Sequence, residues 1–387
     1  MSDKPKAVKS GNVTPEEMVQ ITIDWLNHGL TGKELEHKYG HGAPHISKLI
    51  SRTVRNRWIR ASDGGDIHVS RVQKLEQQLI DTFTTLRLAL VVNTPTSVDT
   101  PHATPQDSAV LSDRVHQDLG KALARLCCEG LFRDNDRIGF GSGRGVYYTL
   151  QALRTMPRLR IRDTALLPLT GDVYAWDHAR KLTESMDADA HVKMFGECLS
   201  FDSFQNRIGR PIIPKARVFK AARDQTWLGV KPWRPPSHAL LGVGVLGPGH
   251  RFYEEAKTPQ TNSYLSRIAD ELRTLLDLAD SLTRPNDPVP YFPIGDISNN
   301  LFFVNPPKGV SVRPSIKKEI RTVITRINMR LLNVSESELK QINGIILVAG
   351  TLPKALALRD LLMNPEYSIQ VLCTDVGTAE ALLAEVQ

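Results

Sequence analysis

From residue 111 to the C-terminus, short apolar runs alternate with segments that have the spacing of amphipathic helices. Such runs indicate strands buried on both faces, and buried strands of this kind pair in parallel beneath helices on each side. The alternation predicts an α/β fold, with a Rossmann-like parallel sheet, over residues 111–387. The expected strands cover residues 137–141, 164–171, 239–247, 300–304, 344–350 and 369–375.

A different pattern precedes this domain, because three short helix-like segments stand within residues 1–62. A hydroxyl cap, a proline and two acids start the first segment. Thr31 caps the second, which ends at Gly40, and the third covers residues 45–59. Two short helices joined by a tight turn that contains glycine are typical of a helix-turn-helix. We therefore expect an all-α helix-turn-helix domain over residues 1–62.

The third segment is basic, and no acidic residue occurs between Ala43 and Arg60. Its outward positions carry hydroxyls and cations, which can contact the phosphates and base edges of a double-stranded DNA operator. The alternative is a small helical bundle that docks another protein. The candidate DNA-binding residues are His45, Ser47, Lys48, Ser51, Arg52 and Arg55.

Residues 63–110 are expected to connect the two domains as a linker helix and a loop. Apolar side chains at 3–4 spacing predict a long helix from Val69 to about Val92. Residues 93–108 are rich in proline, threonine and serine and predict a loop. The helix could pair with a second subunit or pack on its own domain. We expect a homo-oligomer, because helix-turn-helix proteins usually work in pairs.

Length and composition exclude several classes of protein. A chain of 387 residues is long enough for two or three domains. The four cysteines show no CxxC spacing, so we expect reduced thiols, with no disulfide framework and no metal site. No run approaches the roughly 18 apolar residues of a membrane span, and the N-terminus lacks the apolar core of a signal peptide. We expect a cytoplasmic protein without a membrane partner or a cofactor.

The glycine-rich stretch from Gly139 to Gly145 follows an expected strand and precedes an expected helix. Glycines let backbone N–H groups approach an anion, and the helix N-terminus adds a partial positive charge. Ser142 can donate a hydrogen bond, and Arg144 can pair with a phosphate. The stretch lacks both the ribose-binding acid of a dinucleotide site and the GK[ST] of a Walker A loop. It fits a phosphate-binding turn and a plain structural turn about equally.

Further segments follow in a familiar order: LGVGVLGPG (241–249), IGDISNNLFF (294–303), VAGTLPKALAL (348–358) and TDVGTAEALL (374–383). Together with the glycine turn and the helix-turn-helix, they resemble the SorC family of bacterial transcriptional regulators. This family belongs to the DeoR-like group, whose members carry a sugar-binding effector domain. The resemblance spans residues 14–60 and 112–385 and is most specific toward the C-terminus.

The resemblance implies an effector pocket for a sugar or a sugar phosphate. The glycine turn would hold the phosphate, Lys354 would face the ligand, and Asp296 would accept hydrogen bonds from sugar hydroxyls. The chain departs from the family pattern at Gly145, where a threonine is common, and at Thr351, where a second glycine is common. The candidate effector-binding residues are Gly141, Ser142, Gly143, Arg144, Gly145, Thr170, Gly171, Asp296, Thr351 and Lys354.

The function implied by the resemblance is the regulation of carbohydrate metabolism genes, under allosteric control by a sugar or sugar-phosphate effector. The effector would change the spacing of paired recognition helices in a tetramer or dimer. The rival is a sugar-phosphate isomerase-like enzyme, in which Asp296 would be the base and Lys354 the electrophilic partner. No second acid or base is convincingly placed in the sequence, so we expect no enzyme activity and no catalytic residue.

Overall fold

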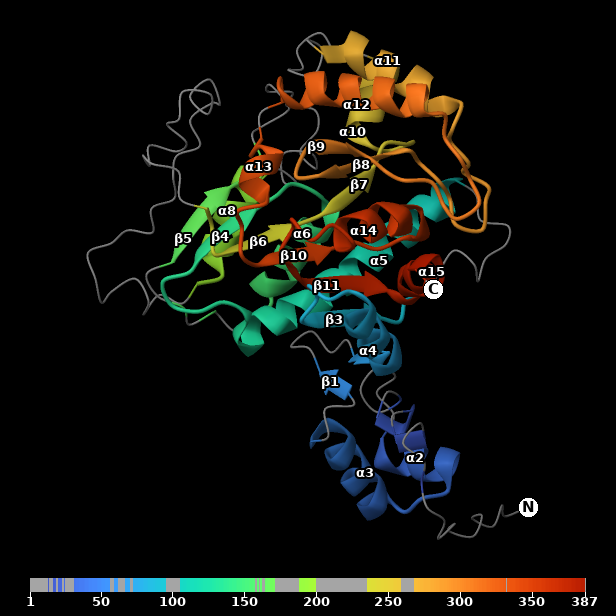
Figure 1. The fold of residues 1–387 in the computed structure, drawn as a ribbon. Coiled ribbons are helices and arrows are strands. Elements are labelled where there is room, and N and C mark those ends of the chain that lie inside the picture. Colours follow the sequence, from blue (N-terminus) through green and yellow to red (C-terminus); the bar gives the residue numbers. More distant parts are fainter. Residues whose placement is uncertain are drawn as a thin grey trace. The chain divides into compact units, whose positions relative to one another are not determined.

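The computed structural model describes residues 13, 17–18, 20–22, 24, 31–55, 59–61, 67–69, 72–94, 105–156, 159, 161, 164–170, 188–199, 235–258, 268–331 and 333–386. Side chains are described for these residues except 43, 51–55, 59–61, 67–69, 105–111 and 189. The chain divides into two compact units, Met1–Arg71 and Val72–Gln387, and each unit is considered by itself (Figure 1).

In the first unit, α2 (Gly32–Tyr39) and α3 (Ala43–Arg55) form a helix pair around a tight turn. The Thr31 side chain accepts a hydrogen bond from the Glu34 backbone N–H, and the Glu34 carboxylate accepts one from the Thr31 N–H. Gly40 ends α2 in the left-handed region, with φ +73°. The helices pack around a small core of Met18, Ile21, Leu35, Ile46, Leu49 and Ile50.

The third helix of the first unit is shorter than expected, because α3 ends at Arg55 and Ile59 begins a strand. This strand, β1 (Ile59–Ala61), pairs antiparallel with β2 (Ile67–Val69). The first unit therefore carries a short two-stranded ribbon after the helix pair. β-branched Ile59 favours the extended conformation over continuation of the helix.

Six parallel strands form the main sheet of the second unit, in the order β3-β11-β10-β6-β4-β5. They are β3 (Leu88–Val92), β4 (Arg137–Phe140), β5 (Ala165–Pro168), β6 (His238–Leu241), β10 (Ile345–Val348) and β11 (Ile369–Asp375). The predicted α/β fold is confirmed. β5, which follows β4 in the chain, lies on one side of β4, and β6 lies on the other side. The direction in which successive strands are added to the sheet therefore reverses between β4 and β6. In such sheets, ligands bind beyond the carboxyl ends of the strands at this reversal.

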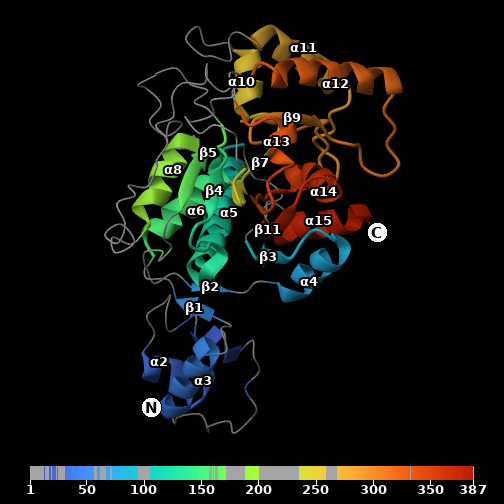
Figure 2. The same cartoon turned by 60° about the vertical axis from the view of Figure 1, so that its left-hand side comes forward.

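Helices cover both faces of the main sheet, because successive residues of a strand point to opposite sides (Figure 2). Ile345 and Leu347 of β10 lie in the core of one face, whereas Ile346 and Val348 lie in the core of the other. The first core is covered by α4 (Gln73–Thr82), α14 (Ala355–Leu362) and α15 (Val376–Val386). The second is covered by α5 (Pro105–Leu126), α6 (Arg144–Arg154) and α8 (Ala188–Glu197).

A second, antiparallel sheet contains β7 (Val243–Val245), β8 (Ile294–Ile297) and β9 (Asn300–Phe303). It shares a separate core with α10 (Arg251–Lys257), α11 (Ala269–Asp280) and α12 (Pro314–Asn328) (Figure 1). The single strand expected over residues 239–247 is therefore wrong: the chain leaves the main sheet at Gly242 and enters the second sheet. The strand expected at 300–304 is real, but it pairs antiparallel, because a two-residue turn at Ser298 and Asn299 folds β9 back on β8.

The long helix expected from Val69 to Val92 is also wrong. α4 ends at Thr82, and Leu88–Val92 forms the edge strand β3, which pairs with β11. Leu79 of α4 is fully buried, and the Glu76 carboxylate accepts a hydrogen bond from the Val91 N–H at 3.0 Å. This stretch thus packs on its own unit. The contribution of residues 63–110 to a homo-oligomer stays a prediction.

Candidate functional site

The glycine turn lies where the strand order of the main sheet reverses. The Gly141 N–H donates to the Leu240 carbonyl oxygen at 3.0 Å, which ties the end of β4 to the end of β6. Gly143 precedes α6 with φ +123°, a conformation that favours glycine, and no described side chain caps this helix. The first N–H groups of α6 are therefore available to an anion, which the helix dipole would stabilise.

Two cations stand beside this turn. Arg144 is the first residue of α6, and Lys354 ends the short 3-10 helix η6 (Leu352–Lys354) that follows β10. Burial and the neighbouring Arg144 lower the pKa of Lys354 to about 8, although Asp375 acts in the opposite direction. Two cations that repel each other in this way favour an anion that neutralises both.

One turn of α5 holds these two cations. His116 Nε2 lies 2.9 Å from Lys354 Nζ, and His116 Nδ1 lies 2.6 Å from the Ser112 carbonyl oxygen. Burial and the charge of Lys354 hold the pKa of His116 well below its usual value, so the ring is neutral. Nδ1–H therefore donates to Ser112, and Nε2 accepts from the lysine. Arg144 Nη1 lies 3.3 Å from Asp113 Oδ1.

Ser142 links the glycine turn to the second sheet. Its hydroxyl donates to Asn299 Oδ1 at 3.3 Å and accepts from Arg251 Nη2 at 3.4 Å. Ser298 and Asn299 form the buried turn between β8 and β9, with φ values of +51° and +64°. The turn thus places an amide over the glycine loop, and α10 supplies Arg251 as a third cation. These hydrogen bonds are long, so a ligand oxygen could replace them at little cost.

Asp296 of β8 lies beside His250, which precedes α10. Asp296 Oδ2 is 3.4 Å from His250 Nε2, and His250 Nδ1 accepts from the Phe252 backbone N–H at 3.3 Å. Nε2 therefore carries the proton and faces the carboxylate. The other oxygen, Asp296 Oδ1, is buried without a hydrogen-bond partner among the described residues. It is a free acceptor for a ligand hydroxyl.

Several other buried polar atoms near these strand ends have no hydrogen-bond partner in the described part of the chain: Thr170 Oγ1, Ser298 Oγ, Asn299 Nδ2 and His191 Nε2. His191 Nδ1 donates to the Gly141 carbonyl oxygen at 2.8 Å. Burial lowers the pKa of His191 to about 4, so its ring is neutral and Nε2 is an acceptor. An unpaired buried polar atom costs about 1–3 kcal/mol. The group therefore suits a ligand with several hydroxyl groups.

Thr351 occupies a strained position that Asp375 supports. Its φ is +82°, and its N–H donates to Asp375 Oδ2 at 2.7 Å. Asp375 also accepts from the Thr378 N–H at 3.1 Å and from the Thr378 hydroxyl at 2.7 Å, at the start of α15. A Cβ at Gly350 would lie 2.5 Å from Asp375 Oδ2, so this carboxylate requires glycine there. Asp375 thus fixes the turn that leads to Lys354.

The structure brings only some of the predicted site residues together. Gly141, Ser142, Gly143 and Arg144 form the turn, and Arg144 connects it electrostatically to Lys354 in the stretch that begins at Thr351. Gly145 lies against β10, Thr170 is buried at the end of β5, and Asp296 pairs with His250. Gly171 lies outside the described residues. The role of each residue in effector binding stays a prediction.

Sequence reasoning missed several residues of this region: Asp113, His116, His191, Asn299 and Asp375. The Ser-Asn-Asn run that follows IGDI is the one available signal, because asparagine tolerates the left-handed conformation that a tight hairpin turn requires. The others come from helices or strand ends whose local sequence does not distinguish them.

The candidate DNA-binding residues are partly described. His45, Ser47 and Lys48 are exposed on α3. Ser51, Arg52 and Arg55 belong to the same helix, but their side chains lie outside the described ones. The proposed contacts with DNA stay a prediction.

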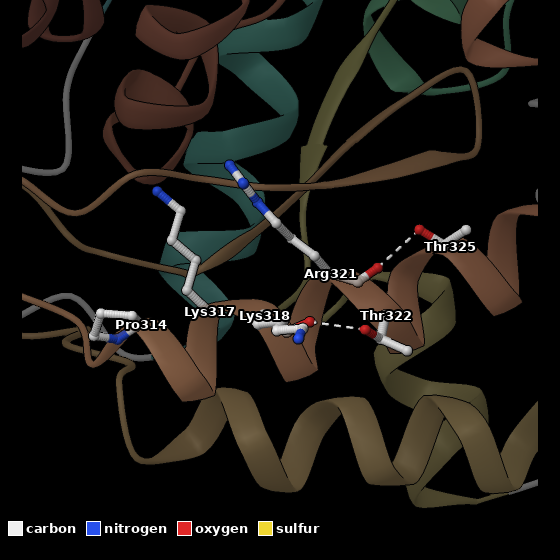
Figure 3. Close-up of a pocket in the computed structure, with 6 residues that line it drawn as sticks. All are labelled: Pro314, Lys317, Lys318, Arg321, Thr322 and Thr325. Carbon is white, nitrogen blue, oxygen red and sulfur yellow. Dashed lines mark hydrogen bonds between the residues drawn. The ribbon is translucent and has the colours of Figure 1, made fainter.

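Hollows on the described surface of the second unit also lie away from the glycine turn. One of about 330 Å³ opens on α12 and is lined by Pro314, Lys317, Lys318, Arg321, Thr322 and Thr325 (Figure 3). The Thr322 hydroxyl donates to the Lys318 carbonyl oxygen and the Thr325 hydroxyl to that of Arg321, both at 2.9 Å. One face of a single helix forms this hollow, and it shares no residue with the glycine turn.

No group of three or more His, Cys, Asp or Glu side chains among the described residues could hold a metal ion. Nor is any helix in the described ranges long and apolar enough to cross a membrane.

No protein-family model and no curated protein matches the chain. Solved structures are similar to it. The full-length sorbitol operon regulator SorC from Klebsiella pneumoniae is 18% identical, with a TM-score of 0.46, over 95% of this chain and 99% of that one. The putative sugar-binding domain of a transcriptional repressor from Vibrio fischeri is 16% identical, with a TM-score of 0.48, over 81% of this chain and 99% of that one.

The probable sor operon regulator from Shigella flexneri is 19% identical, with a TM-score of 0.46, over 80% of this chain and 98% of that one. Another similar structure is described as a DeoR family transcriptional regulator, from Listeria monocytogenes. The chain is thus similar to SorC and DeoR regulators, the group that its sequence motifs resemble. At these identities the likeness is one of fold.

Proposed function

We propose that the chain is a transcriptional regulator of carbohydrate metabolism genes that binds double-stranded DNA through its first unit and a sugar phosphate through its second. The ligand assignment rests on the kinds of side chain that lie around the glycine turn of the second unit. Cations meet there at a glycine turn and a helix N-terminus, and buried polar atoms without partners lie nearby. An anionic group suits the first set, and sugar hydroxyls suit the second.

The proposed phosphate end lies at the turn from Gly141 to Arg144, together with Lys354, which is close enough to Arg144 for the two charges to interact. The proposed hydroxyl end lies at Asp296 and Asn299, whose unpaired atoms offer one acceptor and one donor. A sugar phosphate would satisfy both ends, whereas an unphosphorylated sugar would leave the two cations without an anionic ligand. Phosphorylated ligands are therefore expected to bind more tightly than their parent sugars.

The DNA-binding role rests on α3, which exposes His45, Ser47 and Lys48 and has no acidic residue along its length. The helix follows a tight turn after α2, as a recognition helix does in a helix-turn-helix. Paired recognition helices need two copies of the chain, so we expect a dimer or tetramer in the cytoplasm. The effector would act by favouring one arrangement of the subunits.

The test is a binding assay with both ligands. A labelled duplex from upstream of the protein's own gene is titrated with the protein, with competitor DNA in excess and at two salt concentrations. Specific binding that weakens with salt, and that responds to a sugar phosphate but not to the parent sugar, is the expected result. Incubation with the same sugar phosphates should yield no product, because we expect the site to bind without turnover.

A further inference from the structure

Both cations of the proposed phosphate end are held by a single turn of α5. Asp113 and His116 lie three positions apart and therefore on the same face of the helix. Asp113 contacts Arg144, and His116 contacts Lys354. Neither residue belongs to the glycine turn or to the strand ends that form the site, so α5 acts on the ligand region through the two cations.

His116 has the chemistry of an orienting group. Its Nδ1–H is committed to the Ser112 carbonyl oxygen, which fixes the ring plane and leaves only Nε2 facing Lys354. A neutral ring accepts from the ammonium without adding charge, whereas a carboxylate in its place would neutralise the lysine and compete with an anionic ligand. His116 is itself buried, so the acceptor has little freedom to turn away.

Asp113 differs because it is a charged and partly exposed partner. Its side chain is 46% exposed and that of Arg144 is 39% exposed, so water screens their ion pair. Such a pair is weak enough for a phosphate to displace, and the arginine fork could then turn toward the anion. Asp113 therefore competes with a phosphate for Arg144, whereas His116 holds Lys354 in position.

We propose that this turn of α5 sets the affinity of the anion site: His116 is a positioning residue that orients Lys354, and Asp113 restrains Arg144 until an anion replaces it. The proposal rests on the proposed function for the identity of the ligand. The role of His116 in orienting Lys354 does not depend on the proposed function, because this role can be measured without any ligand.

The ionisable groups that face Lys354 come from three elements. His116 lies on α5, Arg144 on α6, and Asp375 at the end of β11. Arg144 repels the ammonium and Asp375 supports it, so the remaining variable is the acceptor at residue 116. Removal of that acceptor leaves the ammonium with one hydrogen-bond partner fewer, which favours the uncharged amine.

The ligand-free test measures the reactivity of Lys354 against pH. Trace acetylation with acetic anhydride labels only the uncharged amine, and mass spectrometry of the Lys354 peptide gives the midpoint. The wild-type midpoint is expected near pH 8. His116→Gln keeps an acceptor and should keep the midpoint. His116→Leu should lower it by about one pH unit or more, the equivalent of one hydrogen bond to a charged group.

Gln117→Ala is the matched control, because Gln117 is exposed on the same helix turn. Circular dichroism establishes that each variant is folded. A midpoint in His116→Leu that equals the wild-type value overturns the role of His116. If this variant does not fold, His116→Gln decides, because a shifted midpoint in a variant that retains an acceptor also contradicts the proposal.

The second test measures the dissociation constant of inorganic phosphate by calorimetry at pH 7. His116→Leu should bind phosphate about tenfold more weakly, because Lys354 loses its fixed position. Asp113→Asn should bind it about two- to fivefold more tightly, because the competing charge is gone. Weaker binding by Asp113→Asn would show that Asp113 supports the site and would overturn its role as competitor.

Failure of the proposed function gives a different pattern. If the wild-type protein binds no phosphate and no sugar phosphate, the anion site and the role of Asp113 are both overturned. The acetylation midpoints then still decide whether His116 orients Lys354. Binding that is equal in all variants, with unchanged midpoints, rejects the role of α5 while leaving the proposed function intact.

Discussion

Replacement of Gly145 by alanine tests how closely α6 packs against the main sheet. A Cβ at this position would lie 2.5 Å from the carbonyl oxygen of Val348, and 3.1 and 3.2 Å from the two methyl carbons of the same residue. The nearest atom belongs to the backbone of β10, which cannot rotate away. This packing also accounts for the departure from the family pattern at Gly145, because a threonine would meet the same carbonyl.

The expected loss of stability follows from the distance by which α6 must move. Normal contact between heavy atoms requires α6 to withdraw by about 1 Å, and overpacking of this kind costs about 1–3 kcal/mol. The gain from replacing a helical glycine by alanine is about 0.5–1 kcal/mol. The free energy of unfolding of Gly145→Ala should therefore fall by about 1 kcal/mol, and by about 2.5 kcal/mol at most. Phosphate binding should also weaken, because Arg144 moves with the helix.

Gly196→Ala is the matched control. Gly196 also lies in a helix, α8, but the nearest atom to its Cβ position is 3.9 Å away, at Leu166 Cδ1. The same substitution should stabilise the protein there, by about 0.5–1 kcal/mol. Urea unfolding followed by far-ultraviolet circular dichroism compares the midpoints of both variants with the wild type. A Gly145→Ala midpoint at or above the wild-type value would refute the close packing of α6 on β10.

Other perturbations give further expected outcomes. The pKa of His191 is about 4 in the folded chain and 6.5 when unperturbed, so the unfolded chain binds more protons between these values. The free energy of unfolding should fall by up to about 3 kcal/mol as the pH drops from 6.5 to 4, and acid titration of His191→Gln should show less of this loss. Lys354→Met should weaken phosphate binding at pH 7, and wild-type binding should itself decline as the pH rises through about 8 and Lys354 loses its proton; calorimetry measures both. Arg52→Ala and Arg55→Ala should each weaken DNA binding and reduce the salt slope by about 1, without any change in phosphate affinity.

The fold class was predictable because both faces of the central strands are buried. In residues 344–350, a continuous apolar run is the direct result of a sheet covered on each side. The edge strand β3 was not predictable in the same way. The 3–4 spacing of Leu75 and Leu79 continues through Phe83 and Leu86 beyond the end of α4, so the helix period conceals the strand that begins at Leu88.

The candidate site was predictable where the backbone itself requires a residue type. Gly143 adopts a positive φ, and such positions favour glycine, which is visible in the sequence. The support for Lys354 was not predictable, because His116 is 238 positions away in the chain and has no local pattern that marks it. The hairpin at Ser298 and Asn299 lies between these cases, since its residue types suit a tight turn but do not show that it faces Ser142.

The proposed function requires that one chain couples a sugar-phosphate site to DNA binding. Fluorescence anisotropy with the duplex from upstream of the protein's own gene tests it most directly, when each of a set of sugar phosphates and its parent sugar is added to the preformed complex. We expect tight, competitor-resistant binding that at least one sugar phosphate changes and its parent sugar does not. In Lys354→Met, the same sugar phosphate should leave DNA binding unchanged. DNA binding that no sugar phosphate alters, or a response that persists in Lys354→Met, would contradict the proposed function.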